Sequence, residues 1–181
     1  MKKYILLFLI LSISVSLSAQ KYFTKTAKVS FYSSAPLENI EATNNAVGIL
    51  LNAESGDLNF SLLIKSFVFE KKLMQEHFNE NYLESDKFPK AKFQGKITNL
   101  SEVNFTKDGK YTIEVSGDLS IHGETNRIKE PAVILIKNGK PSVGASFSVL
   151  LSDYKIKIPS AVRDKISKDV KIIISGSLKE L

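Results

Sequence analysis

Apolar and polar residues alternate with a period of two over most of the chain, a pattern typical of β-strands with one buried face. The clearest case is residues 111–121, where one face carries Tyr111, Ile113, Val115, Gly117, Leu119 and Ile121. The same period predicts strands around three further apolar sets, namely Phe23, Ala27, Val29 and Phe31; Phe60, Leu62 and Ile64; and Phe93, Gly95 and Ile97. Residues 132–137, 141–151 and 170–178 are predicted as additional strands.

Turn signals separate these strands at residues 54–57, 107–110 and 137–140. The last two contain Asp108-Gly109 and Asn138-Gly139, dipeptides that accept positive φ at low cost and mark tight hairpins. Strands joined in this way are antiparallel.

Two segments depart from the strand period. In residues 70–83 the apolar side chains fall at helical spacing, which predicts about three helical turns that end before Pro89. A shorter helix is predicted at residues 160–167, after Pro159. Many antiparallel strands with few helices favour a closed barrel over a sandwich, because closure removes exposed strand edges. We therefore predict an all-β fold.

The first nineteen residues indicate export. Lys2 and Lys3 precede an apolar run at residues 4–15, and Ser16, Ser18 and Ala19 follow it. The run is shorter than the roughly 20 residues that span a membrane. We predict a signal peptide at residues 1–19, cleaved near Ala19, and a mature domain at residues 20–181 in the periplasm.

Removal of Lys2 and Lys3 lowers the formal net charge from +6 to +4. The remaining basic residues are interleaved with acids and do not gather on one face, so we expect no nucleic-acid partner. A weak, transient attraction to anionic lipid head groups is compatible with this charge. The chain has no cysteine, so the exported domain folds without disulfides.

No nucleophile elbow, phosphate-binding loop, dinucleotide fingerprint or zinc-binding helix motif occurs in the sequence. With no cysteine and two isolated histidines, His77 and His122, we expect neither a metal site nor a cofactor. His77 has three interpretations: an anchor of its helix, a contact to a ligand head group, or a general base. His122 is interpreted as a packing residue at the barrel rim or as a donor to a ligand oxygen or phosphate.

Three stretches resemble the YceI-like family of exported bacterial proteins: residues 73–97 (LMQEHFNENYLESDKFPKAKFQGKI), residues 117–132 (GDLSIHGETNRIKEPA) and residues 153–159 (DYKIKIP). The resemblance covers the mature chain. It implies an antiparallel, up-and-down, lipocalin-like barrel of about eight strands that holds a polyisoprenoid or related amphiphilic lipid. Enzyme activity is not established for the family as a whole, and we expect none here. The resemblance also leaves a homodimer open.

An eight-stranded barrel is wide enough to hold one slender ligand. We therefore expect the inward side chains to line an apolar tunnel, with Gly95 and Gly117 either leaving room for a lipid tail or relieving strain. The helix at residues 70–83 would cover the mouth. The candidate ligand-binding residues are Phe60, Leu62, Ile64, Met74, His77, Phe78, Phe93, Tyr111, Ile113, Val115, Leu119 and His122.

The sequence departs from many members of the family at its first strand, because residues 22–32 lack the tryptophan and the histidine-serine pair that those members carry.

Three functions are considered: a periplasmic lipid carrier, an enzyme that uses His77 or His122 as an acid-base group, and a filled barrel that acts as an interaction module. The carrier is preferred.

Overall fold

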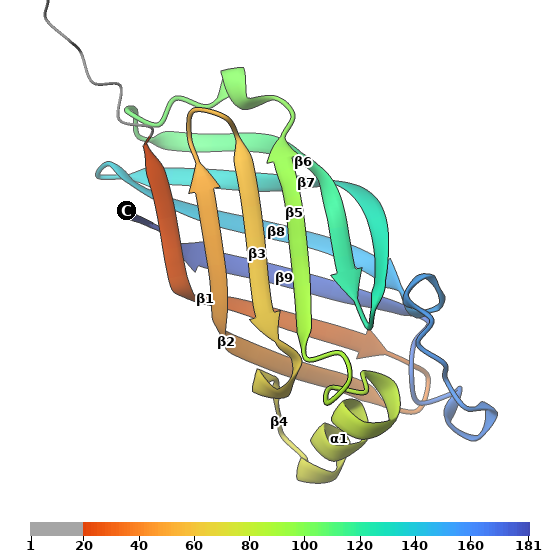
Figure 1. Cartoon of the computed structure of the whole chain (residues 1–181). Coiled ribbons are helices and arrows are strands. Elements are labelled where there is room, and N and C mark those ends of the chain that lie inside the picture. Colours follow the sequence, from red (N-terminus) through yellow and green to blue (C-terminus); the bar gives the residue numbers. More distant parts are fainter. Residues whose placement is uncertain (1–19) are drawn as a thin grey trace, which may run out of the picture.

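Eight long strands close into an antiparallel barrel in the computed structural model, which describes residues 20–181 (Figure 1). The strands are β1 (Lys21–Ser34), β2 (Asn39–Asn52), β3 (Asp57–Leu63), β5 (Lys90–Ile97), β6 (Gly109–Ile121), β7 (Glu124–Lys137), β8 (Lys140–Leu150) and β9 (Asp169–Ser177). Their order around the barrel is β1-β9-β8-β7-β6-β5-β3-β2, and pairing of β1 with β2 closes the ring. The predicted barrel is confirmed. The predicted signal peptide lies outside the described residues.

Short elements complete the fold. The two-residue strands β4 (Val68–Phe69) and β10 (Lys179–Glu180) pair with β2 and β1. Between β3 and β5 the chain forms a 3₁₀ turn at Ile64–Ser66, the helix α1 (Lys72–His77) and a π-helical turn at Phe78–Tyr82. Further 3₁₀ turns occur at Leu100–Glu102, Leu151–Tyr154 and Ser160–Val162. The predicted helix at residues 160–167 is therefore only one short turn. No helix within residues 20–181 is long and apolar enough to cross a membrane.

Two hairpins use tight two-residue turns with positive φ at both central positions. Asn138 and Gly139 join β7 to β8 with φ of 52° and 68°, as their sequence predicts. His122 and Gly123 join β6 to β7 with φ of 53° and 79°. Both have the type I′ form, whose twist matches that of the flanking strands. Asp108 forms no hairpin of its own. Its carboxylate accepts hydrogen bonds from the Asn138 and Gly139 amides, at 2.7 and 3.1 Å.

The sequence pattern did not predict β2, because its centre carries Asn44, Asn45 and Gly48, which have low strand propensity. Asn44 is fully buried. Its side-chain amide donates to the Leu63 carbonyl at 2.9 Å, and its side-chain oxygen accepts from the Ala46 amide at 2.9 Å. These bonds satisfy a polar group that would otherwise be costly to bury.

The predicted inward face of β1 is correct at Ala27, Val29 and Phe31 but wrong at Phe23. The register with β2 shifts between Thr24 and Ala27, and Tyr22 is buried instead of Phe23. A β-bulge places an extra residue in one strand, so the faces exchange across it.

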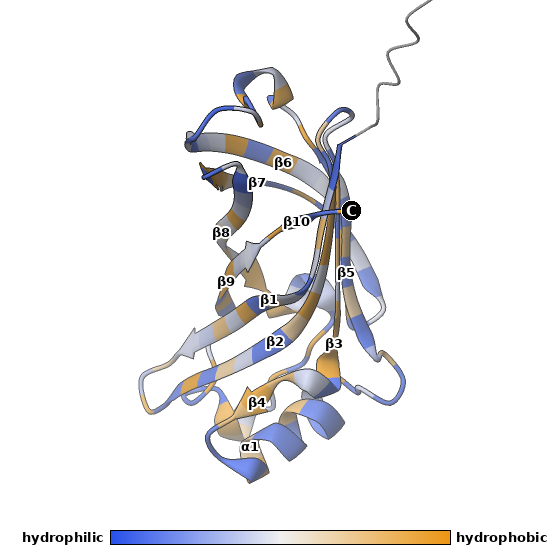
Figure 2. Cartoon of the chain, turned by 90° about the vertical axis from the view of Figure 1, so that its left-hand side faces the viewer, coloured by the Kyte–Doolittle hydropathy of each residue, from blue (hydrophilic) through white to orange (hydrophobic). Residues whose placement is uncertain are grey.

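The barrel interior is filled at one end. There the buried side chains include Tyr22, Leu51, Ile97, Ile134, Ile136 and Leu178. The loop that connects β5 to β6 covers this end, and Phe105 from the loop stacks on Tyr22 with 5.7 Å between ring centroids. The segment from Ile64 to Tyr82 lies across the opposite end (Figure 2). We call this segment the lid and that end the mouth.

Candidate ligand-binding cavity

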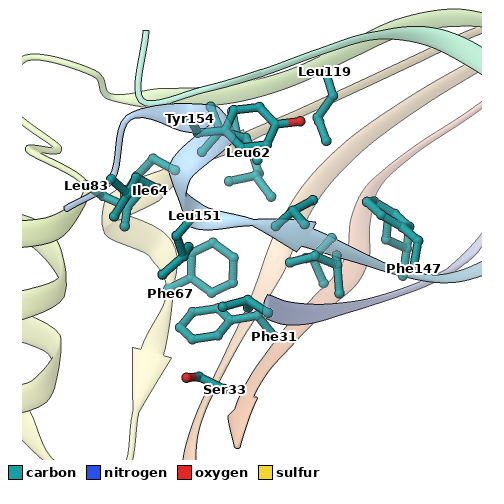
Figure 3. Close-up of a pocket in the computed structure, with 18 of the residues that line it drawn as sticks. Phe31, Ser33, Leu62, Ile64, Phe67, Leu83, Leu119, Phe147, Leu151 and Tyr154 are labelled. Atoms are coloured by element: carbon teal, nitrogen blue, oxygen red, sulfur yellow. The ribbon is translucent and has the colours of Figure 1, made fainter. Parts of the chain in front are cut away.

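An apolar cavity of about 560 Å³ occupies the half of the barrel nearest the lid. Side chains from both sides of the barrel point into it, together with lid and loop residues such as Phe67 and Leu151 (Figure 3). Ligand pockets of about 300–1,000 Å³ are typical for single small ligands. The interior is therefore filled toward one end and hollow toward the mouth.

Aromatic rings attach the lid to the barrel. Phe78 stacks on Phe31 of β1 with 5.4 Å between ring centroids, and it meets Phe67 and Phe69 at 5.6 and 5.0 Å. Phe31 also makes edge contacts with Phe67 and Phe69. Such pairs add to the free energy gained by burial. We call these four residues the aromatic cluster; all four line the cavity.

The helix predicted at residues 70–83 is present, but its second half is wider than an α-helix. The Leu83 amide donates to the Phe78 carbonyl at 2.9 Å, a spacing of five residues. The chain then leaves the helix through Glu84, which has φ of 42°. π-helical turns shift the side chains that follow them, and here Leu83 is buried and lines the cavity.

Gly95 of β5 and Gly117 of β6 are paired, and the Phe93 ring lies over both. A Cβ atom built on Gly95 would lie 2.4 Å from the Ser116 carbonyl oxygen and 2.6 Å from Phe93 Cζ. The expectation that these glycines leave room for a ligand is therefore wrong, because the aromatic ring occupies that space. Because neither residue has a Cβ atom, β5, β6 and the Phe93 ring can approach one another closely.

Ten of the twelve predicted residues line the cavity: Phe60, Leu62, Ile64, Met74, His77, Phe78, Phe93, Ile113, Val115 and Leu119. His77 is exposed at the mouth, whereas Met74 and Phe78 are partly buried. The lid is attached through the aromatic cluster, and the exposed His77 is not its anchor. The side-chain amide of Asn79 donates to the Gln75 carbonyl, so this bond stays within the helical segment.

Tyr111 does not line the cavity. It shares a strand face with Ile113, but it lies near the filled end, and its hydroxyl donates to the Lys107 carbonyl at 2.9 Å. Its position in the alternating pattern was correctly predicted. Its depth along the barrel was not predicted, because that depth depends on the β5–β6 loop that fills this end of the barrel. The sequence of this loop has no strand period that would have marked it.

His122 also lies outside the cavity lining. Its Nδ1 is 3.0 Å from the Tyr154 carbonyl oxygen and its Nε2 is 2.9 Å from a Glu84 carboxylate oxygen. Phe88 packs edge-on against the imidazole at 4.8 Å. Both nitrogens are thus engaged in linking three segments, which leaves neither free to bind a ligand or act as a base.

Several lining residues were missed. Phe31, Phe147, Ile172 and Ile174 lie in predicted strands, and a full projection of every strand face would have found them. Phe67 and Phe69 follow β3 in a segment without strand or helix period, so nothing local marked them. Glu130 was missed as well. Its carboxyl faces an otherwise apolar wall, and burial raises its pKa.

Among residues 20–181, no three histidine, cysteine or acidic side chains are close enough together to hold a metal ion. The charged residues of the lining, apart from Glu130, are Glu38, Lys71, His77, Lys92 and Lys165, which lie toward the mouth. Lys71 and Glu38 form an ion pair at 3.4 Å. The cavity thus has a charged mouth and an apolar interior.

Solved structures with the same fold support this description. A polyisoprenoid-binding domain from Saccharophagus degradans implicated in plant cell wall breakdown aligns with a TM-score of 0.78 at 12% identity, covering 89% of this chain and 98% of that one. BcnA from Burkholderia cenocepacia aligns with a TM-score of 0.68 at 14% identity, covering 84% and 96%. A mutant Campylobacter jejuni YceI protein with a monobromobimane guest aligns with a TM-score of 0.54 at 17% identity, covering 100% and 99%.

A comparison with curated proteins found no match. The family model of the YceI-like domain, however, matches residues 15–178, which is nearly the whole chain. The eight-stranded barrel agrees with that match. The chain therefore belongs to the YceI-like domain family.

Proposed function

We propose that this protein is a periplasmic carrier that holds the chain of a long amphiphilic lipid, such as an isoprenoid quinone or a polyprenyl species, inside the barrel without chemical change. The observation that carries the proposal is the apolar cavity of about 560 Å³ beneath the lid. Each buried methylene contributes about 0.8 kcal/mol, so an alkyl or prenyl chain gains affinity without many polar contacts. The family match and the Saccharophagus degradans domain, described as polyisoprenoid-binding, support this ligand class.

The mouth is where we place the polar head of the ligand. His77 is exposed there, and Lys71 and Lys165 also line this part of the cavity. The opposite end is filled by side chains around Tyr22, so a chain that enters at the mouth ends within the barrel. The twelve predicted residues thus divide into a tail-binding set and His77 at the head, with Tyr111 and His122 in structural roles.

Exposed apolar residues around the mouth support a transient membrane contact. Leu37, Val68 and Leu73 are 71%, 64% and 61% exposed. Leu73 lies on α1 and also lines the cavity. A lipid that moves between a bilayer and this cavity would stay in contact with apolar side chains along its path. We propose that the mouth faces the membrane during transfer.

A binding experiment tests the carrier proposal. The mature chain is titrated with a fluorescent long-chain probe, and the variant Ala145→Trp is compared with Ser175→Trp. Ala145 lines the cavity, whereas Ser175, on the neighbouring strand β9, is exposed. We expect the bulky side chain at residue 145 to weaken probe binding at least about tenfold while residue 175 tolerates it. Equal binding by both folded variants would place the ligand elsewhere.

Vesicle flotation tests the membrane contact separately. Leu73→Ser and Val68→Ser should reduce binding of the mature chain to lipid vesicles. Leu135→Ser is the matched control, because Leu135 is 44% exposed on β7 near the filled end. Equal loss in all three variants would contradict a contact specific to the mouth.

A further inference from the structure

Glu130 is a charged residue in the barrel wall rather than at the mouth. It lies on β7 between Ile128 and Ala132, and all three side chains line the cavity. In the ladder with β6 it is paired with Val115, which also lines the cavity. Its carboxyl group therefore faces a largely apolar surface six residues, or roughly 20 Å, along β7 from Glu124, where this strand leaves the hairpin.

No hydrogen bond or ion pair from within residues 20–181 reaches the Glu130 carboxyl group, and burial alone raises its pKa. The nearby cations point outward. Lys129 pairs with Glu114 at 3.0 Å, and Arg127 pairs with Asp118 at 3.3 Å. Placing a carboxylate without a partner in apolar surroundings costs free energy of folding. The fold itself does not need a carboxylate at position 130.

Strand pairing in the barrel wall is interrupted beside Glu130. The ladder between β7 and β8 runs from Lys137 and Lys140 to Ala132 and Ala145 and stops there. The next residue of β7 is Pro131, which has no amide hydrogen to continue the ladder. Nearer the hairpin, the side-chain amide of Asn126 donates to the Asp153 carbonyl at 2.7 Å. This hydrogen bond links β7 to the turn at Leu151–Tyr154. Glu130 therefore lines the cavity beside a stretch of wall without strand pairing.

An ionised carboxylate can only accept hydrogen bonds. A hydroxyl or amide N–H on the ligand would satisfy it, whereas a phosphate or carboxylate at this depth would be repelled. We propose that Glu130 is a specificity-determining residue whose carboxylate accepts a hydrogen bond from a hydroxyl or amide group of the bound amphiphile. This inference rests on the proposed carrier function and adds a second polar contact, separate from the mouth.

The test uses a pair of ligands that differ only in the donor. 12-Hydroxystearate (the alcohol) and 12-methoxystearate (the ether), each with a carboxylate head for the mouth, compete with an apolar fluorescent probe for the mature chain at pH 8. Hydrogen bonds to charged groups predict that the wild type prefers the alcohol about tenfold or more. Glu130→Leu should lose this preference while binding the ether at least as well as the wild type does. Asp118→Asn, which removes a carboxylate from the outer face, should keep it.

Glu130→Gln retains a carbonyl acceptor without the charge and should show a smaller preference. Equal affinity for alcohol and ether in the wild type, or a preference that persists in folded Glu130→Leu, would overturn the role of Glu130. Failure of both ligands to bind the wild type would instead count against the carrier function itself.

Discussion

The Nε2 atom of His122 lies 2.9 Å from a carboxylate oxygen of Glu84, which joins the β6–β7 hairpin to the chain just after the lid. The other ring nitrogen donates to the Tyr154 carbonyl at 3.0 Å, so one side chain holds three segments together. The His122 side chain is only 10% exposed, whereas that of Glu84 is 45% exposed. The histidine that looked like a candidate for chemistry is a connector next to the mouth.

We expect His122→Asn to loosen the mouth while preserving the turn. Asparagine accepts positive φ in a type I′ turn but cannot reach both partners. Loss of these bonds should cost about 1–3 kcal/mol, measured by urea unfolding. Release of a bound probe should also be faster. If probe release stays unchanged in a destabilised variant, the connector acts on stability alone.

The packing of Phe93 over the glycine pair predicts that Gly117→Ala is severely destabilising. A Cβ atom on Gly117 would lie 2.5 Å from the Gln94 carbonyl oxygen, and backbone atoms cannot easily move away. We expect a loss of more than about 2 kcal/mol in the free energy of unfolding. Gly48→Ala is the control, because its nearest contact would be an ordinary 3.6 Å. Similar effects in both variants would contradict this account.

The aromatic cluster predicts that Phe78 anchors the lid. Phe78→Ala removes a ring that touches Phe31, Phe67 and Phe69. Because the ring is only partly buried, we expect a cost toward the lower end of about 3–5 kcal/mol. Hydrogen exchange should show lost protection in the lid while β6 and β7 remain protected. Phe78→Leu, which keeps an apolar side chain, should behave more like the wild type.

Two glutamates should contribute to the free energy of unfolding with opposite dependence on pH. Burial raises the pKa of Glu130 in the folded state, so the folded chain binds this proton more tightly, and its contribution to stability falls as pH rises through the folded pKa. Glu130→Gln should therefore be more stable than the wild type at pH 7–8, and the difference should vanish below the pKa of unfolded glutamate, about 4.3.

Glu114 provides the matched comparison. Hydrogen bonds from Thr98 and then Lys129 lower its pKa, so its contribution is present above the unfolded pKa and is lost as pH falls through the folded pKa. Glu114→Gln should be less stable than the wild type near pH 7 and similar to it in acid. Urea unfolding of the three proteins from pH 3 to pH 8 measures both effects. Parallel curves for both variants would contradict the assigned environments.

Much of the fold could be predicted from the sequence, because the inward and outward faces of β6 alternate without interruption from Tyr111 to Ile121. Prediction failed where a tertiary contact replaces a local signal. Asn44 makes β2 look unlike a strand, yet its side chain bonds to Leu63 and Ala46. The bulge after Thr24 exchanges the faces of β1, and only the register with β2 reveals it.

The candidate site was predicted in the same uneven way. Apolar lining residues such as Val115 follow from strand alternation. The depth of the cavity does not, because it depends on how the loop carrying Phe105 fills one end. Nor does the unpaired stretch of wall beside Glu130, because it depends on where the β7–β8 ladder stops. Local sequence patterns predict whether a side chain points into or out of the barrel. Its position along the barrel axis can be determined only from the registers of the paired strands.

In the proposed function, the hollow half of the barrel holds a long-chain lipid. Native mass spectrometry of the protein, purified gently from its own host cells, tests this binding when combined with organic extraction and identification of the bound molecule. We predict a stoichiometric long-chain amphiphile, and the same spectrum reports the oligomeric state. A bare protein mass that stays unchanged after incubation with quinones, polyprenyl alcohols and fatty amides would contradict the carrier function.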